Sequence, residues 1–194
     1  MSTAPLRVDL ALISGWIRDG ARILDLGCGD GTLLAHLAEQ RQVSGYGLEI
    51  DADEIAGCIA RGVNVLQGDL DDGLRDFASA SFDYVVMTQA LQALQRPDHA
   101  LAEMLRVGHT AIVTFPNFGH WRARLDILRG RMPATAALPA AWYETENIHL
   151  CTVRDFEQLC AERRWKIVRR SLLDHDHHDG WLQRLAPNLF SEIA

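Results

Sequence analysis

Residues 23–32 read Ile-Leu-Asp-Leu-Gly-Cys-Gly-Asp-Gly-Thr, and this stretch decides the fold. Its apolar residues, Ile23, Leu24 and Leu26, predict a short buried parallel strand. Alternate glycines then form a tight loop, and leucines at helical spacing follow Thr32. A strand, a glycine loop and a helix in this order open a nucleotide-type βαβ unit. Glycine suits such a loop because it tolerates unusual backbone angles and lets a ligand lie against bare backbone.

The spacing of the glycines narrows the class of ligand. A dinucleotide fingerprint, G-x-G-x-x-G, would place its last glycine where Thr32 stands, whereas the third glycine here is Gly31. Asp30 also lies inside the loop, where a carboxylate would repel a pyrophosphate but not a cationic ligand. The pattern D-x-G-x-G-x-G, beginning at Asp25, closely resembles the first motif of the class I S-adenosylmethionine-dependent methyltransferases. Their ligand carries a sulfonium and an ammonium and no phosphate. The alternative is a purely structural turn.

Length and composition set the broad class. A chain of 194 residues, 48% hydrophobic and 23% charged, predicts one globular domain over residues 1–194. No run of about 18 apolar residues and no secretory signal pattern is present, so we expect no membrane association. The net charge of −7 argues against a nucleic-acid binder. Four cysteines without a C-x-x-C pair are expected to be reduced thiols in a cytoplasmic protein.

Strand and helix patterns alternate along most of the chain. This order predicts an α/β, Rossmann-like fold, with a mostly parallel sheet and helices on both faces. Residues 116–150 interrupt the pattern as an excursion, which contains a predicted short helix over 121–128 and is typical of a lid, a binding loop or an interface. Methyltransferases of this class end with an antiparallel seventh strand. Only residues 192–194 remain to supply it, so we expect that strand to be short or truncated.

Two acidic residues follow predicted strands, at the edge where an open α/β sheet binds its ligand. Glu49 lies 22 residues after Gly27, close to the roughly 20 expected for an acid that accepts from ribose hydroxyls. The alternative for Glu49 is a solvated carboxylate. By resemblance to the methyltransferases, Asp69 accepts from the adenine amino group and the backbone amide of Leu70 meets the ring. The alternative for Asp69 is a loop acid that only shapes its turn.

The same resemblance places the methionyl part of the cofactor beside the backbone of Thr88 and Gln89, after the fourth strand; the alternative is a strand end that faces water. Asp25 would face the cofactor's amino group, directly or through water, or brace the loop. The cofactor is expected to be S-adenosylmethionine or S-adenosylhomocysteine. Its expected contacts are Asp25, Gly27, Cys28, Gly29, Gly31, Glu49, Ile50, Asp69, Leu70, Thr88 and Gln89.

A catalytic residue is harder to predict. The residues after the fourth strand contain neither the N-P-P-Y motif of amino methyltransferases nor a Pro-Cys nucleophile. His120 is the best general-base candidate, although a lone loop histidine is more often structural. The cluster of His175, His177 and His178 lacks the spacing of a closed metal site, so we predict a solvated loop and no metal site.

Three segments resemble one family more specifically. They are Phe-Pro-Asn-Phe-Gly-His-Trp at 115–121, Gly-Arg-Met-Pro at 130–133, and the stretch from Trp142 to Thr152. Together with the glycine loop, they resemble the methionine-biosynthesis protein MetW family over nearly the whole chain. The resemblance implies a role in methionine biosynthesis, as an amino-acid biosynthesis protein that works with a homoserine O-acyltransferase. It does not imply a methyl acceptor.

Two functional hypotheses follow. In the first, the protein binds the cofactor as an accessory or regulatory partner of the acyltransferase, which it contacts through residues 116–150. In the second, it is an S-adenosylmethionine-dependent methyltransferase that acts on a small molecule. The missing acceptor motif, the acidic composition and the family resemblance favour the first hypothesis. A nucleic-acid methyltransferase is a third reading, which the net charge disfavours.

Overall fold

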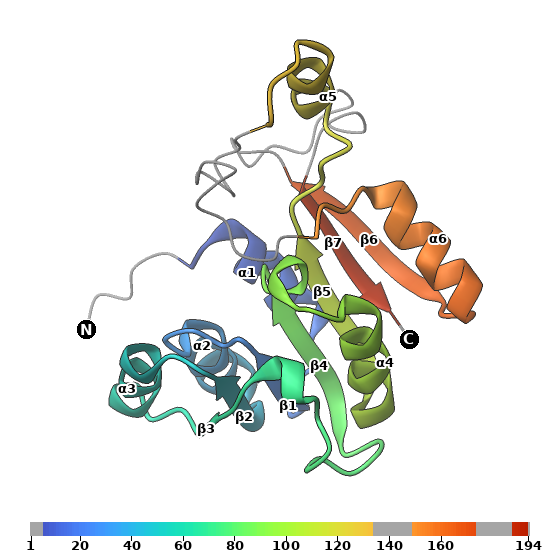
Figure 1. Cartoon of the computed structure of the whole chain (residues 1–194). Coiled ribbons are helices and arrows are strands. Elements are labelled where there is room, and N and C mark those ends of the chain that lie inside the picture. The colour runs from blue at the N-terminus through green and yellow to red at the C-terminus, as the bar shows by residue number, and fades with distance from the viewer. Residues whose placement is uncertain (1–5, 134–148, 174–187, 194) are drawn as a thin grey trace.

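A seven-stranded sheet forms the centre of the molecule (Figure 1). The computed structural model describes residues 6–133, 149–173 and 188–193. The strand order is β3-β2-β1-β4-β5-β7-β6, and the first five strands in this order are parallel. The strands are β1 (Arg22–Leu26), β2 (Ser44–Glu49), β3 (Val65–Gln67), β4 (Phe82–Thr88), β5 (Gly108–Phe115), β6 (Ile167–Leu173) and β7 (Asn188–Ile193).

Helices cover both faces of the sheet, as the sequence predicts (Figure 1). No helix in the described part of the chain is both long and apolar enough to span a membrane. One face carries α1 (Val8–Trp16), α2 (Thr32–Arg41) and α3 (Ala52–Ala60), and the other carries α4 (Pro97–Val107) and α6 (Val153–Arg163). The remaining helical segments are α5 (Trp121–Leu128) and two 3-10 turns, η1 (Leu70–Asp72) and η2 (Leu91–Ala93).

Alternation of side chains in β1 creates the two cores. Leu24 and Leu26 point to the face covered by α4 and α6, where they join a cluster that includes Met104 and Phe156. Ile23 points to the opposite face, into the cluster formed with α1 and α2. Successive residues of a strand face opposite sides of the sheet, so both faces of this central strand are buried. The sequence shows this as an almost continuous apolar run.

Side chains cap the first turns of α3 and α6. The side chain of Asp51 accepts from the backbone N–H groups of Asp53 and Glu54 at the start of α3. Thr152 starts α6 with a capping box, in which Thr152 accepts from the backbone of Asp155 and Asp155 accepts from the backbone of Thr152. Each cap satisfies N–H groups that the first turn of a helix leaves without partners. The predicted helix over 121–128 is also confirmed as α5, while residues 134–148 of the excursion lie outside the described part.

The expectation that only residues 192–194 supply the last strand is wrong. Strand β7 begins at Asn188 and pairs antiparallel with β5 on one side and β6 on the other. A strand between two others satisfies the backbone groups along both of its edges, which favours its extension over the whole length of its neighbours. Backbone pairing on both sides therefore sets the start of this strand.

Gly31 and Gly62 offer a matched test of packing beside the glycine loop. Both have left-handed φ angles, +75° and +74°. A Cβ on Gly31 would lie 2.9 Å from Cys58 Sγ and 3.2 Å from Val63 Cγ2, whereas a Cβ on Gly62 would meet nothing within 4 Å. We expect Gly62→Ala to lower the free energy of unfolding by about 1 kcal/mol, through backbone strain alone. Gly31→Ala should cost about 1–3 kcal/mol more because it also overpacks the site.

Urea denaturation of both variants, without added ligand, measures this difference. Equal losses in the two variants would show that Gly31 is not crowded.

Candidate functional site

The residues predicted to bind a ligand lie at the carboxyl ends of four neighbouring strands, β3, β2, β1 and β4. Strand β1 pairs with β2 on one side and with β4 on the other, so the chain changes direction across the sheet at this point. Open α/β sheets bind ligands in the crevice at such a switch point. The loops after these strands are therefore the candidate site.

Glu49, the last residue of β2, holds the glycine loop in place. Its Oε2 accepts from the backbone N–H of Gly29 at 2.9 Å. Its Oε1 accepts from the N–H groups of Ile50 at 2.8 Å and Asp51 at 3.1 Å. An ionised carboxylate offers about four acceptor positions, so Glu49 retains capacity for one more donor. The structure thus gives Glu49 a loop-bracing role that the sequence did not indicate.

The glycine loop brings three strand ends together. Gly27 has a left-handed φ of +67°, and Gly29 has one of +53°. A Cβ on Gly27 would lie 3.4 Å from Ala90 Cβ, after β4, and 3.9 Å from Leu70 Cδ1, after β3. The absence of a side chain at Gly27 therefore leaves bare backbone where the loops after β1, β3 and β4 approach one another. Ala90 was not a predicted contact because an alanine carries no chemical signal.

Asp25 is a buried carboxylate with an unsatisfied oxygen. It lies in β1 between Gly47 of β2 and Val86 of β4, and only 1% of its surface is exposed. Its Oδ1 has no hydrogen-bond partner. Burial raises the pKa of Asp25 to about 7, and the negative charge of Glu49 adds to this rise. A positively charged group at this position would stabilise the ionised form, so the site is suited to a cation.

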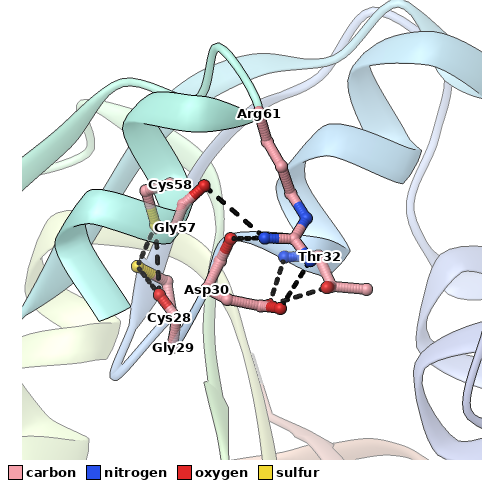
Figure 2. Close-up of polar contacts among 7 residues, drawn as sticks. All are labelled: Cys28, Gly29, Asp30, Thr32, Gly57, Cys58 and Arg61. Atoms are coloured by element: carbon pink, nitrogen blue, oxygen red, sulfur yellow. Dashed lines mark hydrogen bonds and ion pairs between the residues drawn. The ribbon is translucent and has the colours of Figure 1, made fainter. Parts of the chain in front are cut away.

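Asp30, in contrast, is balanced by the protein itself (Figure 2). Its Oδ1 accepts from the backbone N–H of Thr32 at 3.1 Å and from the Thr32 hydroxyl at 2.6 Å. Arg61 pairs with its Oδ2 at 2.7 Å and donates to its carbonyl oxygen at 3.1 Å. The Thr32 hydroxyl and the charge of Arg61 lower the pKa of Asp30. Asp30 therefore links the start of α2 to the end of α3, and its charge contributes little to selecting a ligand.

Two thiols lie beneath the loop (Figure 2). The sulfur atoms of Cys28 and Cys58 are 3.7 Å apart, and Cys58 Sγ donates to the carbonyl oxygen of Gly29 at 3.1 Å. Burial raises the pKa of both thiols, so they remain protonated at neutral pH. Their role in the described structure is to fix the loop against α3. The side chain of Cys28, a predicted cofactor contact, is turned toward Cys58.

The structure separates the three acidic residues after β3. Asp69 is exposed, and its side chain caps η1 by accepting from the N–H of Asp71 at 2.9 Å. Asp71 accepts from the backbone N–H of Gln95 at 2.9 Å, which joins this loop to the approach to α4. Asp72 is exposed in the same loop. Of the three acids, Asp69 follows β3 most closely. It lies near Glu49, because the N–H of the preceding residue, Gly68, donates to the carbonyl oxygen of Glu49.

Gln89, after β4, has a backbone conformation rarely adopted by a non-glycine residue, with φ of +55°. Its N–H donates to Thr114 Oγ1 at 2.9 Å, and its carbonyl oxygen accepts from Gln92 Nε2 at 2.6 Å. The first contact ties the end of β4 to β5, and the second ties it to η2, so both hold the strained residue. Strained residues of this kind cluster at ligand-binding sites. Thr88, the last residue of β4, is half-buried beside it.

His120 lies in the turn before α5. Its N–H donates to the carbonyl oxygen of Asn117, and its ring lies 5.8 Å from that of Trp121, between centroids. The catalytic role of His120 stays a prediction. Across the described ranges, no group of three or more His, Cys, Asp or Glu side chains is arranged to hold a metal ion. Residues 174–179, with their histidines, lie outside those ranges.

A cavity of about 440 Å³ lies near the carboxyl ends of β4 and β5, between α4 and α6. The sequence did not predict it, because its walls come from segments far apart in the chain. Apolar side chains form most of the wall of this cavity, and a few charged and polar side chains also line it. The apolar lining includes Leu91, Leu101, Phe115, Phe156 and Leu159, and the polar lining includes Arg96, Asp98, His149 and Asp155.

Two sequence comparisons give the same family. A family model described as "Methionine biosynthesis protein MetW" matches residues 7–194. A "Bifunctional methionine biosynthesis protein MetXA/MetW" from Rhodopirellula baltica is 33% identical over 203 residues, a match that covers 100% of this chain and 33% of that protein. The chain thus spans about one third of the length of this relative.

Solved structures show the fold. An S-adenosylmethionine-dependent methyltransferase from Mesorhizobium loti superposes with a TM-score of 0.69 at 15% identity, covering 96% of this chain and 97% of that one. A possible histamine N-methyltransferase from Thermotoga maritima superposes with a TM-score of 0.67 at 17% identity, covering 96% of this chain and 87% of that one. The [4+2]-cyclase SpnF superposes with a TM-score of 0.68 at 16% identity, covering 96% of this chain and 79% of that one. The predicted methyltransferase-like fold is therefore confirmed.

The raised pKa of Asp25 predicts how stability depends on pH. Between about pH 4 and pH 7 the folded protein retains a proton that the unfolded chain has lost, so its free energy of unfolding falls as pH rises. Asp25→Asn cannot ionise. Relative to this variant, the free energy of unfolding of the wild type should fall by on the order of 4 kcal/mol between pH 4 and pH 7, and it should fall no further above pH 7.

Urea denaturation of the ligand-free proteins at several pH values measures the effect. Asp72→Asn, which alters an exposed carboxylate, serves as the control and should follow the wild type. A constant difference between wild type and Asp25→Asn at all pH values would contradict the raised pKa.

Proposed function

The chain belongs to the MetW family of methionine biosynthesis proteins and has the fold of the S-adenosylmethionine-dependent methyltransferases, and on this basis we propose that it binds S-adenosylmethionine or S-adenosylhomocysteine and serves as an accessory or regulatory partner of a homoserine O-acyltransferase. The observation that carries the ligand assignment is the unpartnered oxygen of Asp25, which is buried in the strand that leads into a glycine loop braced by Glu49.

The chemistry of the strand ends fits each part of this cofactor. Asp25 suits the ammonium of the methionyl part, because a cation would satisfy its orphaned oxygen and stabilise its charge. The bare backbone at Gly27 and Gly29 permits close approach of the ligand. Glu49 retains one acceptor position, which would take a ribose hydroxyl.

The remaining contacts come from the loops after β3 and β4. Asp69 and Leu70 would meet the adenine, and the strained backbone at Gln89 would meet the methionyl part together with Thr88. When bound, S-adenosylmethionine supplies an electrophilic methyl group, and S-adenosylhomocysteine supplies none. The accessory role requires only binding, so either form can act as its ligand.

The partner assignment is supported by the fused relative. That protein is named MetXA/MetW, and the part similar to this chain is only one third of its length. Joining two proteins in one chain raises their effective concentration and favours their association. If the cofactor binds the complex and the free protein with different affinities, it must shift complex formation by the same factor. We infer that the cofactor regulates the acyltransferase in this way.

The alternative function, methyl transfer to a small molecule, is favoured by one observation. The apolar cavity of about 440 Å³ near the ends of β4 and β5 has a volume typical of small-molecule sites. The fold does not decide between these functions, because the [4+2]-cyclase shares it. Transfer of labelled methyl from S-adenosylmethionine to a component of a cell extract would support the enzyme.

Two substitutions test the cofactor site. Glu49→Ala and Asp69→Ala should each weaken binding of S-adenosylhomocysteine by roughly tenfold or more, because each removes a charged hydrogen-bond acceptor. Asp72→Ala removes an exposed carboxylate from the same loop as Asp69 and should change the affinity by less than about twofold. Isothermal titration calorimetry gives all three dissociation constants. Unchanged affinity in Glu49→Ala and Asp69→Ala would refute their roles.

The accessory role predicts a physical and kinetic effect on the partner. The homoserine O-acyltransferase of the same organism should co-purify with this chain, and its rate should change when the chain is added. Adding S-adenosylmethionine or S-adenosylhomocysteine should alter the size of that change. An acyltransferase that forms no complex and keeps the same rate under all conditions would rule the role out.

A further inference from the structure

Helix α5 and the turn after it form an apolar protrusion. Figure 1 shows α5 beyond the carboxyl end of the sheet, away from the two helical layers. Leu128 is 83% exposed, and Ile127 and Met132 are each 56% exposed. Ala123 within this segment and Pro133 directly after it are buried. We call residues 121–132 the α5 surface.

The charge of the α5 surface is opposite to that of the whole chain. Arg124, Arg129 and Arg131 are exposed within it, and Asp126 is its only acidic residue. The chain as a whole carries a net charge of −7. A short segment that exposes both apolar side chains and arginines is suited to a protein interface, where arginine is enriched and lysine is depleted.

The α5 surface is attached firmly at the edge that carries the glycine loop. Asn117, between β5 and α5, accepts through Oδ1 from the N–H groups of Gly119 at 2.8 Å and Val153 at 3.3 Å. The N–H of Phe118 donates to the carbonyl oxygen of Cys151 at 3.0 Å. These contacts join the segment before α5 to the start of α6. A partner bound at α5 would therefore lie on the carboxyl side of the sheet, where the cofactor is proposed to bind.

We propose that the α5 surface is where the acyltransferase partner docks, through an apolar patch of that enzyme bordered by carboxylates. This inference rests on the partner role in the proposed function. The fused relative supplies a protein partner, and the arginines supply the charge that such a patch complements. An anionic membrane is disfavoured because α5 has only eight residues and the rest of the chain is acidic. A nucleic-acid partner is also disfavoured, because the net charge of the chain is −7 and nucleic acids are anionic.

Matched substitutions test the surface. Leu128→Ser and Arg129→Glu change exposed residues on α5 and after it, and neither alters the core. Ile59→Ser, at an exposed isoleucine of α3, and Arg75→Glu, at an exposed arginine, make the same chemical changes elsewhere. The dissociation constant of each variant for the purified acyltransferase is measured by calorimetry, with S-adenosylhomocysteine binding as a measure of folding. Sedimentation of each variant alone and titration with anionic phospholipid vesicles complete the set.

The expected result is that both α5 variants bind the acyltransferase about thirtyfold or more weakly, as at an interface hot spot, while the controls stay within about twofold. Cofactor binding should be unchanged in all four variants. If the wild type binds the enzyme and the α5 variants bind it equally well, the docking surface is refuted and the partner role survives. If the wild type does not bind the enzyme, the partner role itself fails. Loss only of self-association or of vesicle binding in the α5 variants would also overturn the proposal.

Discussion

The hydrogen bond from the backbone N–H of Gly29 to the carboxylate of Glu49 is the contact on which the candidate site depends. It joins the loop after β1 to the end of β2, while the other oxygen of Glu49 holds the start of the next connection. A carboxylate that accepts from three backbone N–H groups is fixed in position. The glycine loop is therefore held in a conformation that leaves its backbone accessible and the Asp25 carboxylate behind it.

The electrostatics of this edge follow from burial more than from the number of charges. Asp25 and Asp30 lie five residues apart in one motif, yet their environments are opposite. Asp25 is enclosed by the sheet without a partner for Oδ1, and its pKa rises to about 7. Asp30 is paired with Thr32 and Arg61, and its pKa falls. In our proposal Asp25 thus recognises the ligand, whereas Asp30 stabilises the loop.

Local signals predicted most of the fold. Apolar runs, the glycine loop and the alternation of strand and helix patterns predicted the parallel sheet and its helices, because these features act within a few residues of the chain. The caps at Asp51 and Thr152 are equally local. Strand β7 could not be placed in this way, since its pairing with both β5 and β6 defines it. The partners of charged groups were also out of reach, because Arg61 meets Asp30 across 31 residues and Asp71 meets Gln95 across 24.

The sequence by itself determined the family, the class of fold and the strand ends where a ligand is expected, since glycine spacing and strand-end acids are written into short motifs. Only the tertiary structure decided which acids are engaged by the protein, that the Asp25 oxygen is orphaned, and that α5 stands exposed beside the same edge. Burial and pairing depend on which distant segments come into contact when the strands pair and the helices pack on the sheet. A local sequence pattern does not specify these contacts.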